Sequence, residues 1–168
     1  MNLPKRAIAL AMLGVALAAV AYLADFRRMP APDVRFTTIE GEILTTAGLR
    51  GKVVLVNFWA TDCMPCIREM PRLVQTYNAY RARGFETIAV AMSHDPPDSV
   101  REYALRNALP FRVARDASGD LARSFGGVDA LPTTFVIDRR GNIVSRRVGV
   151  LDFERLGALL DEQIREPG

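Results

Sequence analysis

The two cysteines of the chain form a Cys-x-x-Cys pair, and the residues that flank this pair restrict the fold more than any other feature. Val53–Phe58, just before the pair, is almost entirely apolar and rich in β-branched residues, which predicts a buried strand. From Cys63 to about Ala82, apolar residues recur every three or four positions, which predicts a helix that Gly84 ends. The cysteine pair is therefore expected where a buried strand passes into the first turn of a helix.

Strands and helices alternate along the rest of the chain. Strands are predicted at Val34–Ile39, Glu42–Leu44, Phe85–Met92, Phe111–Ala114, Thr133–Asp138 and Ile143–Val148, and further helices at Ser99–Ala108, Ser118–Phe125 and Asp152–Arg165. Asp95–Asp98, which contains two prolines, is predicted to be a loop. This order, which ends in a hairpin and a helix, predicts an α/β fold with a central mixed β-sheet flanked by helices. A chain of 168 residues has room for one such domain and a short appendage.

The first residues of the chain predict attachment to a membrane. Lys5 and Arg6 precede the uncharged apolar run Ala7–Ala24. As a helix this run would span about 27 Å, close to the roughly 30 Å hydrocarbon core of a bilayer. It exceeds the ~7–15 apolar residues of a signal-peptide core, so we expect an uncleaved anchor. Ala19–Ala21 also fits the signal peptidase rule, which leaves a cleaved, soluble product open. Both outcomes export the domain.

The sequence thus divides into residues 1–24 as a transmembrane anchor or signal segment, 25–33 as a linker and 34–168 as the folded domain. Two prolines in the linker disfavour a helix there. The formal net charge of +3 resides within residues 1–30, and the remainder of the chain is balanced. Because nucleic-acid binding requires clustered Lys and Arg, we exclude that class of function.

The predicted place of the cysteines at a helix N-terminus has chemical consequences. Free backbone N–H groups and the helix dipole stabilise a thiolate there and lower its pKa below the free value of about 8.5. Cys63 is expected to be the exposed, attacking thiol, and Cys66 to resolve the mixed disulfide that forms. Pro65 is tolerated in a first turn, where its missing N–H has no intrahelical use.

Other uses of the pair are less favoured. A purely structural disulfide would close a four-residue loop and gain only about 2 kcal/mol. Two thiolates supply half of a tetrahedral metal shell, so a copper-binding module would have to recruit His94 or a methionine. We expect no metal site. A peroxiredoxin would place a Thr three residues before its reactive cysteine, whereas Thr61 stands two residues before Cys63.

Three stretches of the sequence resemble the TlpA/ResA-like family of membrane-anchored, thioredoxin-fold thiol–disulfide oxidoreductases. They are Trp59-Ala60-Thr61-Asp62-Cys63-Met64-Pro65-Cys66, Glu69-Met70-Pro71, and Leu131-Pro132-Thr133-Thr134-Phe135-Val136-Ile137-Asp138. The resemblance covers roughly residues 34–164. It implies a thioredoxin-like fold in which the stretch from about Asp95 to Gly119 is a helix-and-strand insertion.

The same resemblance implies roles for individual residues. Pro132 would be a cis-proline that faces the disulfide, and the backbone of Leu131 would pair with a substrate strand. Glu69 would tune the titration of the cysteines. The predicted substrate-binding residues are Trp59, Met64, Pro65 and Leu131, although core packing alone would also explain Trp59. Thioredoxin carries a buried Asp where this chain has Asn57, which cannot act as a base.

These features predict an enzyme: an exported protein disulfide reductase, a monomer that needs no cofactor beyond its own Cys63–Cys66 disulfide. The resemblance implies apocytochrome c or copper-site assembly factors as clients and a membrane thiol carrier as electron donor. An external donor is required because the chain has no second cysteine pair. A copper-binding protein and a disulfide-forming oxidase on the same fold are the alternatives. His94, the single histidine, is expected to be polar surface in a loop.

Overall fold

The computed structural model describes residues 29–167 together with Met12 and Gly14. The predicted membrane segment therefore lies outside the described residues, apart from those two. Within the described part of the chain, no helix has the length and apolar character needed to cross a bilayer.

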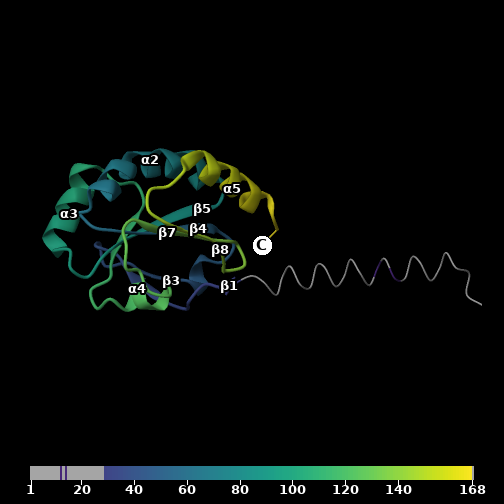
Figure 1. Ribbon diagram of the computed structural model, residues 1–168, viewed down its shortest axis with the longest axis horizontal. Coiled ribbons are helices and arrows are strands. Elements are labelled where there is room, and N and C mark those ends of the chain that lie inside the picture. The colour runs from purple at the N-terminus through teal and green to yellow at the C-terminus, as the bar shows by residue number, and fades with distance from the viewer. Residues whose placement is uncertain (1–11, 13, 15–28, 168) are drawn as a thin grey trace, which may run out of the picture.

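A six-stranded mixed sheet forms the centre of the domain, in the order β1-β8-β7-β4-β5-β6 (Figure 1). The strands are β1 (Met29–Pro30), β4 (Val53–Trp59), β5 (Phe85–Ala91), β6 (Arg112–Arg115), β7 (Thr133–Ile137) and β8 (Asn142–Val148). The central strand β4 pairs parallel with β5 and antiparallel with β7, and all its residues are buried. The predicted mixed sheet and its buried central strand are thus confirmed.

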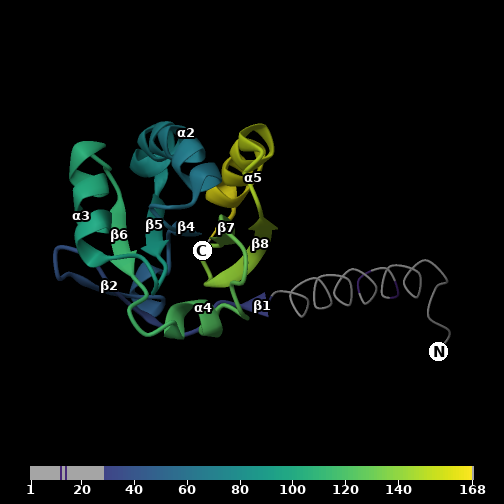
Figure 2. The ribbon, with the colours of Figure 1, turned by 60° about the vertical axis from the view of Figure 1, so that its left-hand side comes forward.

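Helices cover both faces of this sheet. The three long helices, α2 (Met64–Tyr80), α3 (Pro97–Arg106) and α5 (Phe153–Arg165), lie on one face, and the short α4 (Asp120–Ser124) lies on the other (Figures 1 and 2). Two short 3₁₀ helices complete the fold: η1 (Ala47–Leu49) and η2 (Arg81–Arg83).

The side chains of β4 explain this two-sided packing. Successive side chains of a strand point to opposite faces of a sheet. Accordingly, Leu55 and Trp59 join the cluster beneath α2, α3 and α5, whereas Val56 and Phe58 join the cluster beside α4. A strand with a hydrophobic core on each face reads in sequence as a continuous apolar run, which is why Val53–Phe58 could be predicted as central.

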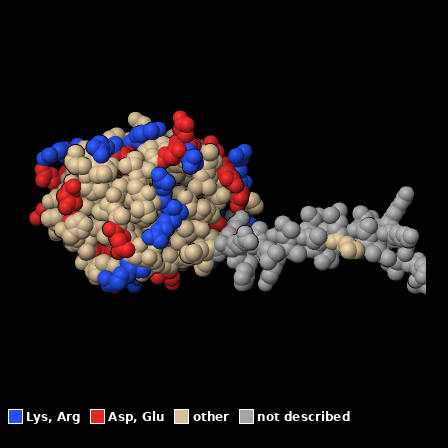
Figure 3. Space-filling view, in the orientation of Figure 1, with Lys and Arg blue, Asp and Glu red and all other residues tan. Residues whose placement is uncertain are grey.

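The hairpin of β2 (Arg35–Thr37) and β3 (Ile43–Thr45) forms a separate two-stranded sheet. It is tied to β6 by a bridge between Thr38 and Ala114 and by Arg112, which pairs with both Glu42 and the buried Glu86. Acidic and basic side chains both occur across the face of the molecule drawn in Figure 3.

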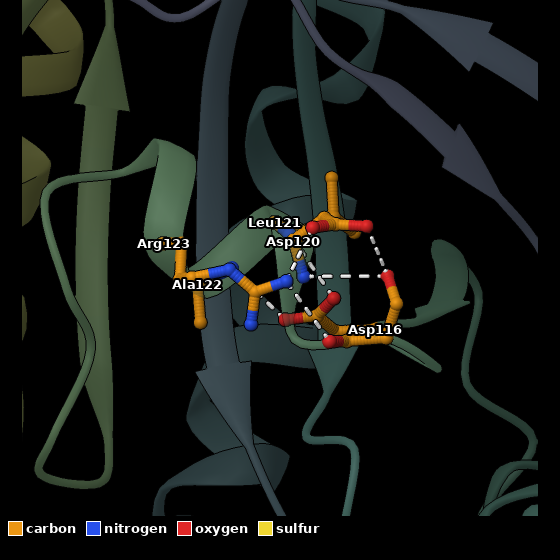
Figure 4. Close-up of polar contacts among 6 residues, drawn as sticks. Asp116, Asp120, Leu121, Ala122 and Arg123 are labelled. Atoms are coloured by element: carbon orange, nitrogen blue, oxygen red, sulfur yellow. Dashed lines mark hydrogen bonds and ion pairs between the residues drawn. The ribbon is translucent and has the colours of Figure 1, made fainter.

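Two elements differ from the sequence prediction. Met29 and Pro30, which fall in the predicted linker 25–33, pair with Ile143 and Asn142 of β8 as an edge strand. Both residues are exposed, so no apolar alternation marks them as a strand. The helix predicted at Ser118–Phe125 is the shorter α4, because Gly119, with a φ of 76°, is not helical. The buried carboxylate of Asp116 accepts from the backbone N–H groups of Leu121 and Ala122 in the first turn (Figure 4).

Candidate redox site

The disulfide between Cys63 and Cys66 lies at the N-terminus of α2. Cys63 is the N-cap residue of the helix, and its Sγ accepts a hydrogen bond of 3.3 Å from the backbone N–H of Cys66. Cys66 is 0 % exposed, whereas Cys63 is partly exposed. A partner molecule can thus reach only the first sulfur, which is the arrangement expected for an attacking thiol followed by a resolving thiol.

Pro132 stands at the end of β7 that lies beside the disulfide. Thr133 is opposite Phe58 in the antiparallel pairing of β7 with β4, so the residues before Thr133 run alongside those that follow Phe58. The Leu131–Pro132 peptide bond is cis, as the family resemblance implied. Leu131 is half-buried and Pro132 is buried. Their predicted contacts with a substrate strand stay a prediction.

Glu69 is a buried carboxylate one turn beyond Cys66, with 3 % of its surface exposed. Its Oε1 accepts from the Asn57 side-chain amide and its Oε2 from the backbone N–H of Leu151, each at 3.1 Å. Burial raises the pKa of Glu69, and the hydrogen bonds from Leu151 and Asn57 partly oppose this. Glu69 is therefore not an ordinary solvated helix charge, and its place on the face of α2 next to Cys66 suits the predicted tuning role.

Asn57 connects Glu69 to the strand that carries the proline. Its Nδ2 donates to Glu69 and, at 3.0 Å, to Oγ1 of Thr134, which is its partner across β4 and β7. Asn57 Oδ1 is buried without a hydrogen-bond partner. We assigned no role to Thr134 from sequence. The available signal was that Asn57 is the one polar residue in the apolar run Val53–Phe58 and needs a polar partner once buried.

The predicted substrate-binding residues fall into two groups. Met64 is 61 % exposed, and Pro65 and Leu131 are partly exposed, so a partner that reaches Cys63 can contact them. Trp59 is 0 % exposed and packs against Tyr103 of α3, with ring centroids 5.1 Å apart. This burial favours core packing as the role of Trp59, since a side chain without exposed surface does not itself contact a partner, and any influence of Trp59 on the docking surface stays a prediction.

The loop after β5 contacts the turn that precedes Cys63. The carboxylate of Asp95 accepts from the backbone N–H of Thr61 at 2.7 Å and from its hydroxyl at 2.5 Å. Next to it, His94 Nε2 lies 3.6 Å from Asp62 Oδ1, and both side chains are exposed. His94 is surface-exposed, as predicted, but it also borders the site. We took Asp95 from sequence only as a loop residue.

The chemistry available to this arrangement is exchange of a disulfide for two thiols. The described residues hold no group of three or more His, Cys, Asp and Glu side chains arranged to bind a metal ion. That the protein needs no cofactor beyond its disulfide stays a prediction.

Comparisons with known proteins agree with this chemistry. The family model described as Redoxin matches residues 27–160. Thiol-disulfide oxidoreductase ResA from Bacillus thuringiensis is 35% identical over 144 residues, which cover 83% of this chain and 82% of that protein. The solution structure of a putative thioredoxin from Neisseria meningitidis has a TM-score of 0.77 and 36% identity, over 82% of this chain and 92% of the other. A thiol:disulfide interchange protein from Chlorobium tepidum has a TM-score of 0.75 and 31% identity, over 82% and 97%.

Proposed function

Since the chain belongs to the Redoxin family and is a thiol–disulfide oxidoreductase of thioredoxin-like fold, we propose that it reduces protein disulfides on the extracytoplasmic side of the cell membrane. The observation that carries the proposal is the site itself. An accessible Cys63 precedes a buried Cys66 at a helix N-terminus, and the buried carboxylate of Glu69 stands one turn further on.

The charges around the two sulfurs favour reduction over oxidation. A strong disulfide oxidant owes its potential to a heavily stabilised thiolate in its reduced form. Met64 and Pro65, between the cysteines, offer no charge or side-chain donor for that purpose, and Arg68 is exposed to solvent. The carboxylate of Glu69, when ionised, disfavours a neighbouring thiolate and raises thiol pKa values. The reduced protein therefore gives up its electrons readily.

The proposed reaction transfers two electrons in two steps. The Cys63 thiolate attacks one sulfur of the client disulfide, which forms a mixed disulfide and releases the other client sulfur as a thiol. Cys66 then loses its proton and attacks Cys63 Sγ, which restores the Cys63–Cys66 disulfide and releases the second client thiol. Glu69, one turn beyond Cys66 on α2, would take the proton of Cys66. A membrane thiol carrier would reduce the disulfide again, because no other cysteine of this chain can.

The proposed clients and location rest on the family and on the N-terminal sequence. Relatives named thiol-disulfide oxidoreductase match over most of this chain, and the resemblance to the TlpA/ResA-like family points to apocytochrome c or copper-site assembly factors. Basic residues followed by the apolar run Ala7–Ala24 support export, with this run as the anchor of a monomeric protein. A cleaved, soluble periplasmic product is the alternative.

The location can be tested by fusing alkaline phosphatase, which folds to its active form only after export, to the C-terminus of the full chain. We expect an active fusion that stays in the membrane fraction, and an inactive fusion when residues 2–24 are deleted. An intact, abundant but inactive full-length fusion would contradict export of the domain. An active fusion in the soluble fraction would show that the N-terminal segment is a cleaved signal segment and not an anchor.

A further inference from the structure

The turn between β4 and α2 is held from outside by the loop that follows β5. Met92 N–H donates to the Trp59 carbonyl at 3.0 Å, where β4 ends. Two residues later along the turn, both oxygens of the Asp95 carboxylate accept from Thr61. The turn itself closes with a hydrogen bond from Cys63 N–H to the Ala60 carbonyl at 3.2 Å. Asp95 thus binds the chain two residues before the attacking cysteine.

Asp95 differs from the other buried carboxylates outside the redox site in that its side chain binds the turn before Cys63. Glu86 is paired with Arg112 and Lys52, Asp116 accepts from the backbone N–H groups of Leu121 and Ala122 in α4, and Asp138 accepts from those of Arg140 and Asn142. Asp95 is 2 % exposed, both of its side-chain hydrogen bonds come from Thr61, and no Lys or Arg of residues 29–167 forms an ion pair with it. No ion pair within residues 29–167 therefore compensates a negative charge on this carboxylate.

The backbone N–H of Thr61 needs a hydrogen-bond acceptor, but that acceptor does not have to be a charged group. A serine, an asparagine or a carbonyl group would satisfy a buried N–H equally well. A carboxylate, in contrast, acts over several ångströms, because its field is weakly screened when it is buried. Consecutive Cα atoms are about 3.8 Å apart, so Cys63 lies within range of a charge bound at Thr61.

We propose that Asp95 is a positioning residue of the redox site: it fixes the turn that presents Cys63, and its buried charge disfavours the Cys63 thiolate and keeps the couple reducing. Only the statement that the protein uses this reducing couple to reduce client disulfides rests on the proposed reductase function. The effect on the thiol is a property of the site.

Other charged groups around Cys63 differ from Asp95 in exposure or position. Asp62 and His94 face each other on the surface, where solvent screens them, and Arg68 of α2 is exposed. Glu69 is buried but lies beyond Cys66 on α2. Asp62 is adjacent to Cys63 in sequence, so it provides a matched control for a carboxylate without burial.

The test compares Asp95→Asn with Asp62→Asn in the full-length protein. An asparagine at position 95 keeps both contacts to Thr61, with its oxygen accepting from the N–H and its amide donating to the hydroxyl. The measurements are the pH dependence of Cys63 alkylation in the reduced protein and the equilibrium constant with a reference dithiol. For Asp95→Asn we expect the pKa of Cys63 to fall by about one unit. We also expect the equilibrium, measured at a pH above the pKa of Cys63 in both proteins, to move about tenfold toward the reduced protein, which is about 30 mV.

Asp62→Asn should change both quantities by less than half as much, because its carboxylate is exposed. The proposal is overturned if Asp95→Asn leaves both unchanged, or changes them no more than Asp62→Asn does. Thr61→Val tests the positioning role separately and also serves if Asp95→Asn fails to fold. We expect it to slow alkylation of the Cys63 thiolate several-fold without lowering the pKa, and Thr61→Ser to restore the rate. An unchanged rate in Thr61→Val would reject the positioning role.

The two proposals fail in different ways. If the unaltered protein did not reduce protein disulfides, the proposed function would fall, but the difference between Asp95→Asn and the unaltered protein would remain measurable. If the variants did not differ, the role of Asp95 would fall while the reductase activity stood.

Discussion

Cys63→Ser should lower the rate of protein disulfide reduction by a factor on the order of 10³ or more, because it removes the nucleophile that begins the exchange. Cys63 is the only accessible sulfur of the pair, since Cys66 is buried and cannot replace it. The measurement is the turnover of an insulin-type disulfide substrate with a dithiol as the electron source.

In the Cys66→Ser variant, Cys63 should still attack the client disulfide. The variant lacks the thiol that resolves the mixed disulfide, so a covalent complex with the client accumulates. Electrophoresis without reductant would reveal this complex, and the trapped proteins would identify the clients. Met64→Ser, a change at an exposed neighbour that leaves both thiols in place, is the control and should trap nothing. Complexes formed by Cys63→Ser but not by Cys66→Ser would contradict the assigned order of attack.

Glu69→Ala should destabilise the oxidised protein by about 2–4 kcal/mol. The substitution removes the acceptor of the Leu151 N–H and one of the two acceptors of the Asn57 amide, which keeps its bond to Thr134, and each such loss costs about 1–3 kcal/mol. Denaturant unfolding with the disulfide intact measures this free energy. The control is Glu102→Gln, which alters an exposed carboxylate on α3 and should change stability by less than about 0.5 kcal/mol.

The effect of Glu69→Gln on the free energy of unfolding should depend on pH. Burial raises the pKa of Glu69 in the folded protein above its ordinary value of 4.5, so below that value the carboxyl is protonated in both states and its charge costs nothing. As pH rises from 4.5 through the raised pKa, the unfolded chain releases its proton first and the folded protein loses stability. The stability of Glu69→Gln relative to the unaltered protein should therefore increase with pH across this window and then level off. A stability difference that does not vary between about pH 4 and pH 8 would show that the pKa of Glu69 is not raised.

Local patterns were sufficient to predict the elements that carry the site. The strand Val53–Phe58 and the helix that begins at Cys63 follow from a continuous apolar run and a three-to-four-residue spacing, each within one stretch of sequence. The accessibility of Cys63 follows from its position at the start of the helix, whereas the burial of Cys66 was not predicted. The cis bond before Pro132 could not be read from periodicity and came from the family resemblance alone.

Features that depend on contacts between distant residues were missed. The bond from Thr61 to Asp95 joins residues 34 apart, and the Asn57–Thr134 bond joins residues 77 apart. A polar residue after a strand looks the same in sequence whether it is solvated or holds another segment, which is why Asp95 read as a loop residue. The sequence also left the role of Trp59 open, because a large aromatic residue next to an active site suits a docking surface and a core equally well.

The direction of electron flow is the central claim, and the reduction potential of the Cys63–Cys66 couple tests it most directly. The full-length protein is equilibrated with dithiol buffers of defined potential, and the fraction of free thiols is measured. For this two-electron couple, about 30 mV corresponds to about 1.4 kcal/mol. We predict a value below about −220 mV, in the range of thioredoxin-type reductants. A value above about −150 mV would contradict the account and make this chain a disulfide-forming oxidase on the same fold.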